Sequence, residues 1–295
     1  MAKVAFDIEW DIDWKSLLDE AEETWKSSVK KKKKKWESLS QSEIDKLRES
    51  LRKSLDNTIF AAAGKRWKSV IDGWLPDSKF KGPLLIRVRF EKLVRPEGRP
   101  NTAALVRPSS LVPMDRGPLP KEGTITIDLD DRKDLLDRRA EFLDVITHEI
   151  GHVLGIGTLF EGAKGSLVDK DKKLFLGEKA LKQYLKLAPG EKVEGVPVTF
   201  QDIEQDRDAF HWNDDPLKWE LMSATLDAPT LGGAPGTGLN AISTVTIGAL
   251  EDLGYIVNEE NAELFALPRG DAVYPLSPRV GRSAYSHCSG CAMNN

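Results

Sequence analysis

The sequence predicts a chain of the α+β class, in which a mixed, twisted sheet packs against helices. Three observations support this prediction. Apolar residues alternate with acidic ones between residues 4 and 14, which is the two-residue period of a strand with one buried face. Two apolar or β-branched runs, 84–90 and 124–128, predict further strands. Several other segments repeat apolar residues at helical spacing, so helices must cover the sheet.

The first predicted strand leads into a helix and a lysine run. From Trp14 onward the apolar residues follow helical spacing, and six consecutive lysines occupy positions 30–35. Because its flanks are acidic, we interpret the run as a solvated face rather than a nuclear-localisation signal or a contact with an anionic surface.

Two helices are expected next. Ser40 and Glu43 have the spacing of a capping box, and an amphipathic helix follows them. A second helical stretch runs from Phe60 to Trp74 and should end before Pro76.

The sheet should be built from residues 84–128. Between its two clear strands the chain is rich in Pro, Arg and Gly, with one possible short strand at 104–106. The strand at 124–128 is a candidate edge strand, along which an extended peptide could bind by strand addition.

The most informative segment is the HExxH pattern at residues 148–152. Residues four apart lie on the same side of a helix, so His148 and His152 can offer two imidazole nitrogens to one metal ion. Zinc accepts neutral imidazole, and a catalytic zinc site has three protein ligands plus a position for water or substrate. Glu149 stands beside the two histidines as a candidate general base. A third ligand must lie elsewhere.

This pattern lies on a helix that should be buried. Apolar residues recur at helical spacing through it, and Gly155 and Gly157 should end the helix, because glycine adopts the left-handed conformation that ends helices. The helix should begin between Asp131 and Arg139. Further along, helices are expected at 178–187 and at 243–253, the latter with Ser243 at its N-cap.

The third ligand is one of a few residues. The chain has only four histidines, so His211 and His287 are the histidine candidates. The competing class is a downstream glutamate, such as Glu161 or Glu178, as in zincins with two histidines and one glutamate. The helix-ending glycines argue against a glutamate, because those enzymes usually continue the helix.

The order of these landmarks resembles the leishmanolysin-like branch of the metzincin metallopeptidases. The landmarks are the motif at 148–157, His211-Trp212, Glu220-Leu221-Met222 and the closing helix and turn at 247–257; residues from about 57 to 260 carry the resemblance. Metzincins generally place the third histidine six residues after the second, where this chain has Thr158. Leishmanolysin-like members supply it after a long insertion instead.

The resemblance implies a metzincin-like zincin fold, with a long helix above, the zinc-binding helix below, and a mostly irregular or helical C-terminal subdomain. It implies that His148, His152 and His211 bind one Zn²⁺, that Glu149 is the general base, and that Met222 lies in a turn beneath the metal. Two features depart from the family. Residues 95–100 replace a glycine-rich stretch, and no cysteine precedes the motif to impose latency.

Four segments follow from these assignments. They are an N-terminal extension (1–56), an upper subdomain with the motif helix (57–158), a lower subdomain with the third ligand and the methionine turn (159–265), and a tail (266–295). The tail carries His287, Cys288 and Cys291, a possible second metal or redox group, although a tail with two thiols and no such role is the favoured interpretation.

Composition excludes several functions. A formal charge of −4 gives no general attraction to nucleic acid or to an anionic membrane, and no apolar run is long enough to span a bilayer. The first residues lack the apolar core of a secretory signal, which favours an intracellular protein unless a leader has been removed.

The sequence therefore predicts a zinc-dependent metallo-endopeptidase acting on proteins or peptides. The alternatives are a catalytically silent zinc fold that serves as a binding or scaffold protein, and a zincin with a glutamate third ligand. The presence of Glu149 favours the active enzyme, because loss of the base is the simplest way to silence such a site.

Overall fold

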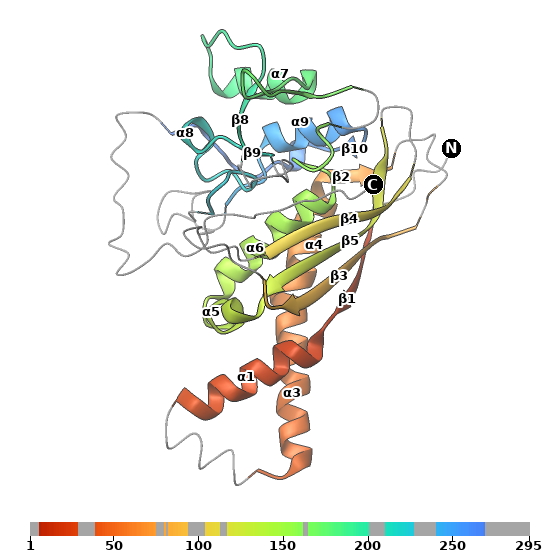
Figure 1. Cartoon of the computed structure of the whole chain (residues 1–295), viewed down its shortest axis with the longest axis vertical. Helices are drawn as coiled ribbons and strands as arrows, with labels where there is room; N and C mark the ends of the chain where they lie inside the picture. The colour runs from red at the N-terminus through yellow and green to blue at the C-terminus, as the bar shows by residue number, and fades with distance from the viewer. Residues whose placement is uncertain are drawn as a thin grey trace.

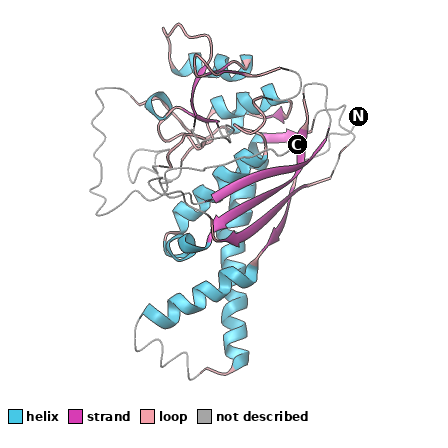
Figure 2. Ribbon diagram, in the orientation of Figure 1, coloured by secondary structure: helices cyan, strands magenta, loops and turns pink. Residues whose placement is uncertain are grey.

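The computed structural model describes residues 6–28, 39–74, 80, 82–93, 104–112, 117–161, 165–200, 210–226 and 240–268. This part of the chain mixes helices and sheets, as the sequence predicted (Figures 1 and 2). The lysine run and the tail with His287, Cys288 and Cys291 lie outside the described residues. Their interpretations stay predictions.

The main sheet has four strands. They are β1 (Ile8–Ile12), β3 (Leu84–Glu91), β5 (Leu119–Asp128) and β4 (Ala104–Val112), in that spatial order. β1, β3 and β5 are parallel, whereas β4 is antiparallel to β5. β3 alternates buried and half-buried residues, because one of its faces covers the core.

Two predictions about this sheet were wrong. The strand at 124–128 was expected at an edge, but it belongs to β5, which lies between β3 and β4. Among the described strands, the edge strand near the motif helix is β4, which is longer than the expected 104–106 and contacts that helix. β1, which lies within the segment assigned to an N-terminal extension (1–56), is a strand of the main sheet. Phe6 and Leu17 belong to its core.

A long helical element packs behind the sheet (Figure 1). It consists of α3 (Gln41–Leu55), a π-helical turn η1 (Asp56–Phe60) and α4 (Ala61–Val70). Ser40 and Glu43 form the predicted capping box, in which the Ser40 amide donates to the Glu43 carboxylate at 2.8 Å. The helix was expected to reach Trp74, but it ends at Val70. Ile71 is extended and begins β2 (Ile71–Gly73), which pairs with β10 (Ile256–Val257).

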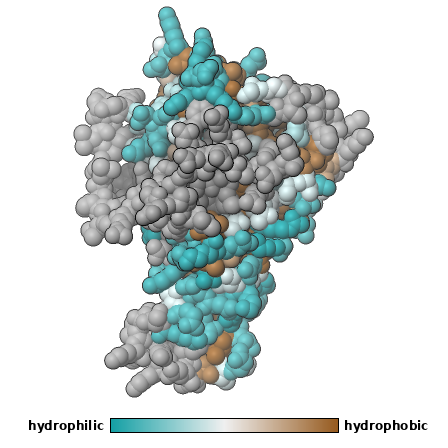
Figure 3. Space-filling view, viewed as in Figure 1, coloured by the Kyte–Doolittle hydropathy of each residue, from teal (hydrophilic) through white to brown (hydrophobic). Residues whose placement is uncertain are grey.

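Helices α1 and α5 complete the half of the molecule that contains the main sheet. α1 (Trp14–Ser28) contacts α3 and α5 (Arg132–Asp137), and η2 (Leu129–Asp131) joins β5 to α5. Figure 3 shows mainly hydrophilic side chains over the part of the molecule that α1 and α3 form. None of the helices in the described ranges has the length and apolar character needed to cross a membrane.

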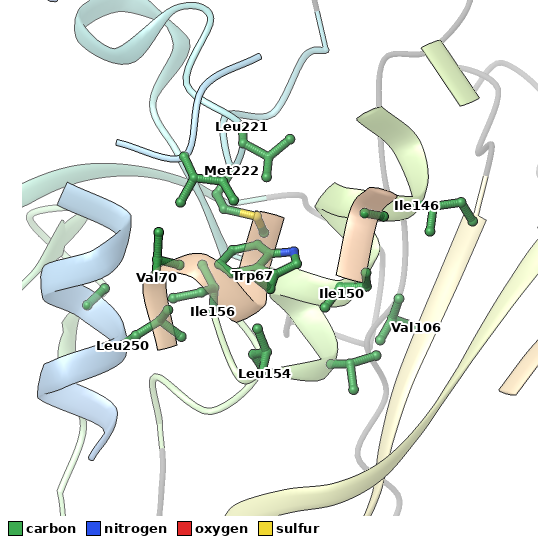
Figure 4. Packing of buried hydrophobic residues seen from close by; sticks show 14 of the residues in the cluster. Trp67, Val70, Val106, Ile146, Ile150, Leu154, Ile156, Leu221, Met222 and Leu250 are labelled. Atoms are coloured by element: carbon green, nitrogen blue, oxygen red, sulfur yellow. The ribbon is translucent and has the colours of Figure 1, made fainter. Parts of the chain in front are cut away.

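The motif lies on α6 (Arg139–Val153), which packs between α4 and the sheet. Figure 4 shows Trp67 of α4 lying beside Met222, Ile150 and Ile156 in the core that these elements share. The half of the molecule after α6 was expected to be mostly irregular or helical. It contains a second, antiparallel sheet of β6 (Val168–Asp169), β7 (Leu174–Phe175), β8 (Val196–Phe200) and β9 (Phe210–Trp212).

Three helices accompany the second sheet. They are α7 (Glu178–Leu187), α8 (Asp214–Leu217) and α9 (Thr244–Leu253), and η3 (Glu259–Asn261) follows them. As predicted, Ser243 caps α9 by accepting hydrogen bonds from the amides of Val245 and Thr246, and Gly254 ends the helix in the left-handed conformation. α9 packs so closely on α7 that a side chain at Gly248 would overlap the backbone of Ala180.

Candidate metal centre

The C-terminal end of α6 is closed by a Schellman motif. Gly155 has a φ of 108°, its amide donates to the His152 carbonyl at 3.1 Å, and the amide of Ile156 donates to the Gly151 carbonyl at 3.0 Å. The glycine is required there for its conformation, and because a side chain would also meet Leu159 at 2.8 Å. The prediction that Gly155 ends the helix is confirmed.

Three buried histidines converge at this end of α6. His148 and His152 lie one turn apart on the helix, and β9 brings His211 from the second sheet. The Nε2 atom of His152 lies 3.0 Å from Nε2 of His148 and 3.0 Å from Nε2 of His211, and the third separation is 3.3 Å. These residues form a group that can hold a metal ion.

The other ring nitrogens of the helical histidines fix their tautomers. Nδ1 of His148 lies 2.6 Å from the Leu221 carbonyl oxygen, and Nδ1 of His152 lies 2.8 Å from the Ile156 carbonyl oxygen. A carbonyl oxygen only accepts, so Nδ1 carries the proton in both rings. In the neutral rings each Nε2 therefore presents a lone pair, and the two lone pairs face each other across 3.0 Å.

A zinc ion fits this donor set. Two lone pairs at such a distance repel unless a cation lies between them, and Nε2 atoms bound to one tetrahedral zinc at ~2.1 Å would be separated by about 3.4 Å. The observed separations of 3.0 to 3.3 Å are close to that value. Carbonyl acceptors on the second nitrogen are also the usual outer partners of metal-binding histidines.

Burial keeps the two helical histidines neutral. It lowers the pKa of His148 to about 4, and burial together with the nearby His148 lowers the pKa of His152 to about 3. A metal ligand must be deprotonated at the nitrogen that binds. Both rings therefore meet this requirement at neutral pH without losing a proton on binding.

Glu149 follows His148 on α6 and is 3% exposed. In the described part of the chain the group able to hold a metal consists of the three histidines, so this carboxylate is not among the ligands. Glu149 directly follows the candidate ligand His148 in the motif, and a carboxylate is one of the side chains that can act as a general acid or base.

The glutamate alternatives lie away from the histidines. Glu161 is exposed and pairs with Lys170 at 2.5 Å, and Glu178 is exposed in the first turn of α7. Thr158, at the usual metzincin position of the third histidine, donates its hydroxyl to the His152 carbonyl at 2.7 Å. The structure thus brings His211, and neither glutamate, to His148 and His152.

Met222 lies in a turn directly beneath the motif helix. Its side chain is fully buried and lies beside Trp67 (Figure 4). A Cβ placed at Gly151 would overlap the Met222 sulfur and lie 3.1 Å from Trp67. The residue before it, Leu221, supplies the carbonyl that accepts from His148. This turn therefore supports the helix by packing and one ligand by hydrogen bonding.

Several supporting residues were not singled out from the sequence. Trp67 donates its indole N–H to the Thr147 carbonyl at 2.8 Å, and Tyr255 donates its hydroxyl to the Leu154 carbonyl at 3.0 Å, so both hold α6 near the motif. In the sequence, the helical spacing of apolar residues around Trp67 predicts that its side chain is buried but does not predict its hydrogen-bond partner. The partners come from elements 80 and 101 residues away, which local patterns do not reveal.

A buried ion network also holds α6, one turn before His148. Asp144 accepts from Arg66 at 3.1 Å and from the amide and side chain of Asn240 at 2.9 and 2.8 Å. Arg66 also pairs with Glu263 at 2.7 Å. Burial raises the pKa of Asp144 to about 6, against the lowering effect of Arg66. The network joins α4, α6 and the segment before α9.

No family model, no curated protein and no solved structure matches this chain in the comparisons with known proteins.

Proposed function

We propose that this protein is a zinc-dependent endopeptidase. The observation that carries the proposal is the meeting of three buried imidazole nitrogens within 3.3 Å of one another, two of them on the helix that also bears the buried Glu149. Three neutral imidazoles leave the charge of a bound dication uncompensated, which is the electronic requirement of a hydrolytic site.

When bound, zinc supplies Lewis-acid polarisation of the scissile carbonyl and acidifies its water. His148, His152 and His211 would hold it. Glu149 would accept the proton of the attacking water and later donate it to the departing amine, so that one carboxylate serves both steps. The carbonyls of Leu221 and Ile156 keep the two helical imidazoles in the tautomer that this arrangement requires.

The sheet supports a peptide as the substrate. Among the described strands, β4 is an edge strand beside α6, and a strand edge offers unpaired backbone groups to an extended peptide. We infer that a protein or peptide substrate binds along β4 by strand addition. This replaces the strand at 124–128, whose two sides are occupied by β3 and β4.

Metal content and peptide cleavage, measured on the same preparation, test the proposal. The purified protein should contain one zinc per chain and cleave casein or a quenched fluorescent peptide. A chelator should abolish cleavage, and added zinc should restore it. A zinc-loaded, folded protein that cleaves nothing in a broad peptide library would contradict the peptidase assignment and favour the silent binding protein.

A further inference from the structure

Glu220 is a fully buried carboxylate that the proposed chemistry does not use. It precedes Leu221 and Met222 in the turn beneath α6. Its Oε2 atom accepts from the Met222 amide at 2.5 Å, and its Oε1 atom accepts from the Ser243 amide at 3.1 Å, the Ser243 hydroxyl at 2.8 Å and the Thr246 hydroxyl at 2.5 Å. One side chain thus satisfies four donors.

These donors join the methionine turn to the start of α9. Ser243 is the N-cap of that helix and Thr246 lies in its first turn, while the Met222 amide belongs to the turn itself. One carboxylate oxygen of Glu220 accepts from the methionine turn, and the other accepts from the start of α9. Glu220 therefore fixes the distance between the turn and the helix. Packing alone would require only an apolar side chain of similar volume, and a buried carboxylate is retained at a desolvation cost.

The same hydrogen bonds reach two of the three histidines. The carbonyl of Leu221, held between Glu220 and the bonded Met222 amide, accepts from His148 Nδ1 at 2.6 Å. On the other side, the Thr246 hydroxyl donates to Glu220 and accepts from the indole N–H of Trp212 at 2.8 Å. Trp212 directly follows His211, and its amide donates to the Met222 carbonyl at 2.9 Å.

We propose that Glu220 is a positioning residue of the metal centre: it orients His148 through the Leu221 carbonyl, and His211 through Thr246 and Trp212. The two ligands come from different elements, α6 and β9, and Glu220 fixes both against α9. This inference rests on the proposed metal centre but not on peptide cleavage.

Glu220 has two hydrogen-bonded connections to the histidines: the Leu221 branch, which leads to His148, and the Thr246 branch, which leads through Trp212 to His211. Two substitutions separate these branches. Glu220→Gln keeps one oxygen, which can still accept from Ser243 and Thr246, but it turns an NH₂ group toward the Met222 amide and so disturbs the Leu221 branch. Thr246→Val removes the hydroxyl between Glu220 and Trp212 at nearly constant volume. Thr246→Ser restores the hydroxyl and is the rescue variant.

Asp252 provides a matched control. It is a partly buried carboxylate of α9 that accepts from the backbone amides of Lys179 and Ala180 at 3.0 Å each, and so joins α9 to α7. Asp252→Asn should lower stability by weakening the hydrogen bonds that join α9 to α7. Asp252 lies on the side of α9 that faces α7, so the substitution leaves the hydrogen bonds of Glu220 unchanged. Its effect on the metal measures what loss of stability alone does.

The experiment measures zinc affinity by competition with a chromophoric chelator, together with the visible spectrum of the cobalt-substituted protein and the unfolding midpoint of the metal-free protein. Outer partners of metal ligands typically contribute ~10 to 100-fold in affinity. We expect losses in this range for Glu220→Gln and Thr246→Val, with altered cobalt spectra, and wild-type affinity and spectrum for Thr246→Ser and Asp252→Asn.

Wild-type affinity and an unchanged cobalt spectrum in Glu220→Gln and Thr246→Val would overturn the inference. So would an equal loss of affinity in Asp252→Asn, because affinity would then merely follow stability. If Glu220→Gln does not fold, the pair Thr246→Val and Thr246→Ser decides alone. A wild-type protein that binds zinc without cleaving peptides refutes the peptidase proposal but leaves this test valid.

Discussion

The sulfur of Met222 occupies the space in which a side chain at Gly151 would begin. Gly151 is the second of the two residues between Glu149 and His152, so the methionine turn touches the motif helix at its centre. The contact explains why a glycine is placed inside a helix, where it costs about 0.5–1 kcal/mol relative to alanine. Helix and turn can approach each other only without a Cβ at this position.

We therefore predict that Gly151→Ala destabilises the protein. Overpacking a filled core typically costs about 1–3 kcal/mol, which exceeds the gain in helix propensity. Denaturant unfolding of the metal-free protein measures the change. Gly64→Ala is the control, because Gly64 is also helical but its new methyl would lie 3.6 Å from Trp10, an ordinary contact. It should be neutral or stabilising.

A double variant tests the cause. Met222→Ala removes the sulfur that the new methyl meets, so the cost of Gly151→Ala should be smaller in that background than in the wild type. Strict additivity of the two substitutions would show that the overlap between Gly151 and Met222 does not determine the cost.

Glu149→Ala should leave zinc bound and the fold intact while lowering peptide hydrolysis by several orders of magnitude, because the proposed base is lost and the three proposed ligands are retained. Zinc content and turnover are measured on the same sample. Glu161→Ala is the control. It changes an exposed glutamate outside the motif and should keep full activity. Substantial turnover by the Glu149 variant would refute its role as the base.

His211→Ala should lose zinc on dialysis against a mild chelator, because removing one of three ligands weakens binding more than losing an outer partner does. Glu178→Ala and Glu161→Ala should retain the metal, since both glutamates are exposed and lie outside the histidine group. His287→Ala should retain it as well. Retention of one tightly bound zinc by His211→Ala, with peptide cleavage, would contradict the third-ligand assignment.

The N-terminal segment should be required for stability, because β1 is a strand of the main sheet and α1 contributes to the core. Leu17 of α1 is fully buried in the core, so Leu17→Ala should lower the free energy of unfolding by about 2–5 kcal/mol. Lys15→Ala changes an exposed ion pair two residues earlier and should stay within about 0.5 kcal/mol. A chain beginning near Ser40 would lack β1 and α1. If it unfolds at the wild-type midpoint, β1 does not contribute to the sheet as described.

The two helical histidines should make the metal-free protein less stable as the pH falls. His148 and His152 have folded-state pKa values of about 4 and 3, below the ordinary value of 6.5, so the unfolded chain binds more protons between these limits. The contribution of the neutral histidines to stability is complete above pH 6.5 and is lost progressively as the pH falls from 6.5 through about 4 and 3. Burial also raises the pKa of Asp144 to about 6 and raises the pKa of Glu220 and Asp252, and these carboxyl groups act in the opposite direction.

Unfolding midpoints measured between pH 7.5 and pH 4 check this dependence. The variant with both helical histidines changed to Gln should show a flatter curve over the same range, because glutamine does not titrate. Equal slopes in the variant and the wild type would assign the acid sensitivity to other groups.

Local patterns predicted the site better than they predicted the sheet order. The HExxH spacing, the helix-ending Gly155 and the Ser40 and Ser243 caps depend on neighbours within a few residues, and the structure contains all of them. The meeting of His211 with the motif was an implication of a family resemblance, because no local rule relates residues 59 positions apart. Its catalytic meaning stays a prediction.

Strand order and strand edges depend on pairing between distant segments. The alternation in residues 4–14 predicted a strand but not its partner, β3, which lies more than 70 residues later. The same limitation placed 124–128 at an edge. The short strands β6 and β7, of two residues each, were missed, because they are too short to show a two-residue period. Three of the four donors to Glu220 belong to Ser243 and Thr246, which lie 23 and 26 positions away, beyond any helical or strand period.

The division of the three histidines between α6 and β9 has a consequence for the order of synthesis. A growing chain presents His148 and His152 long before His211, and the turn that orients His148 is made later still. An unfinished chain therefore holds only two of the three ligands, with no Leu221 carbonyl behind His148. In the proposed enzyme, proteolytic activity would begin only when the second sheet has folded against the first half, so the ribosome and the emerging polypeptide are not exposed to a working peptidase.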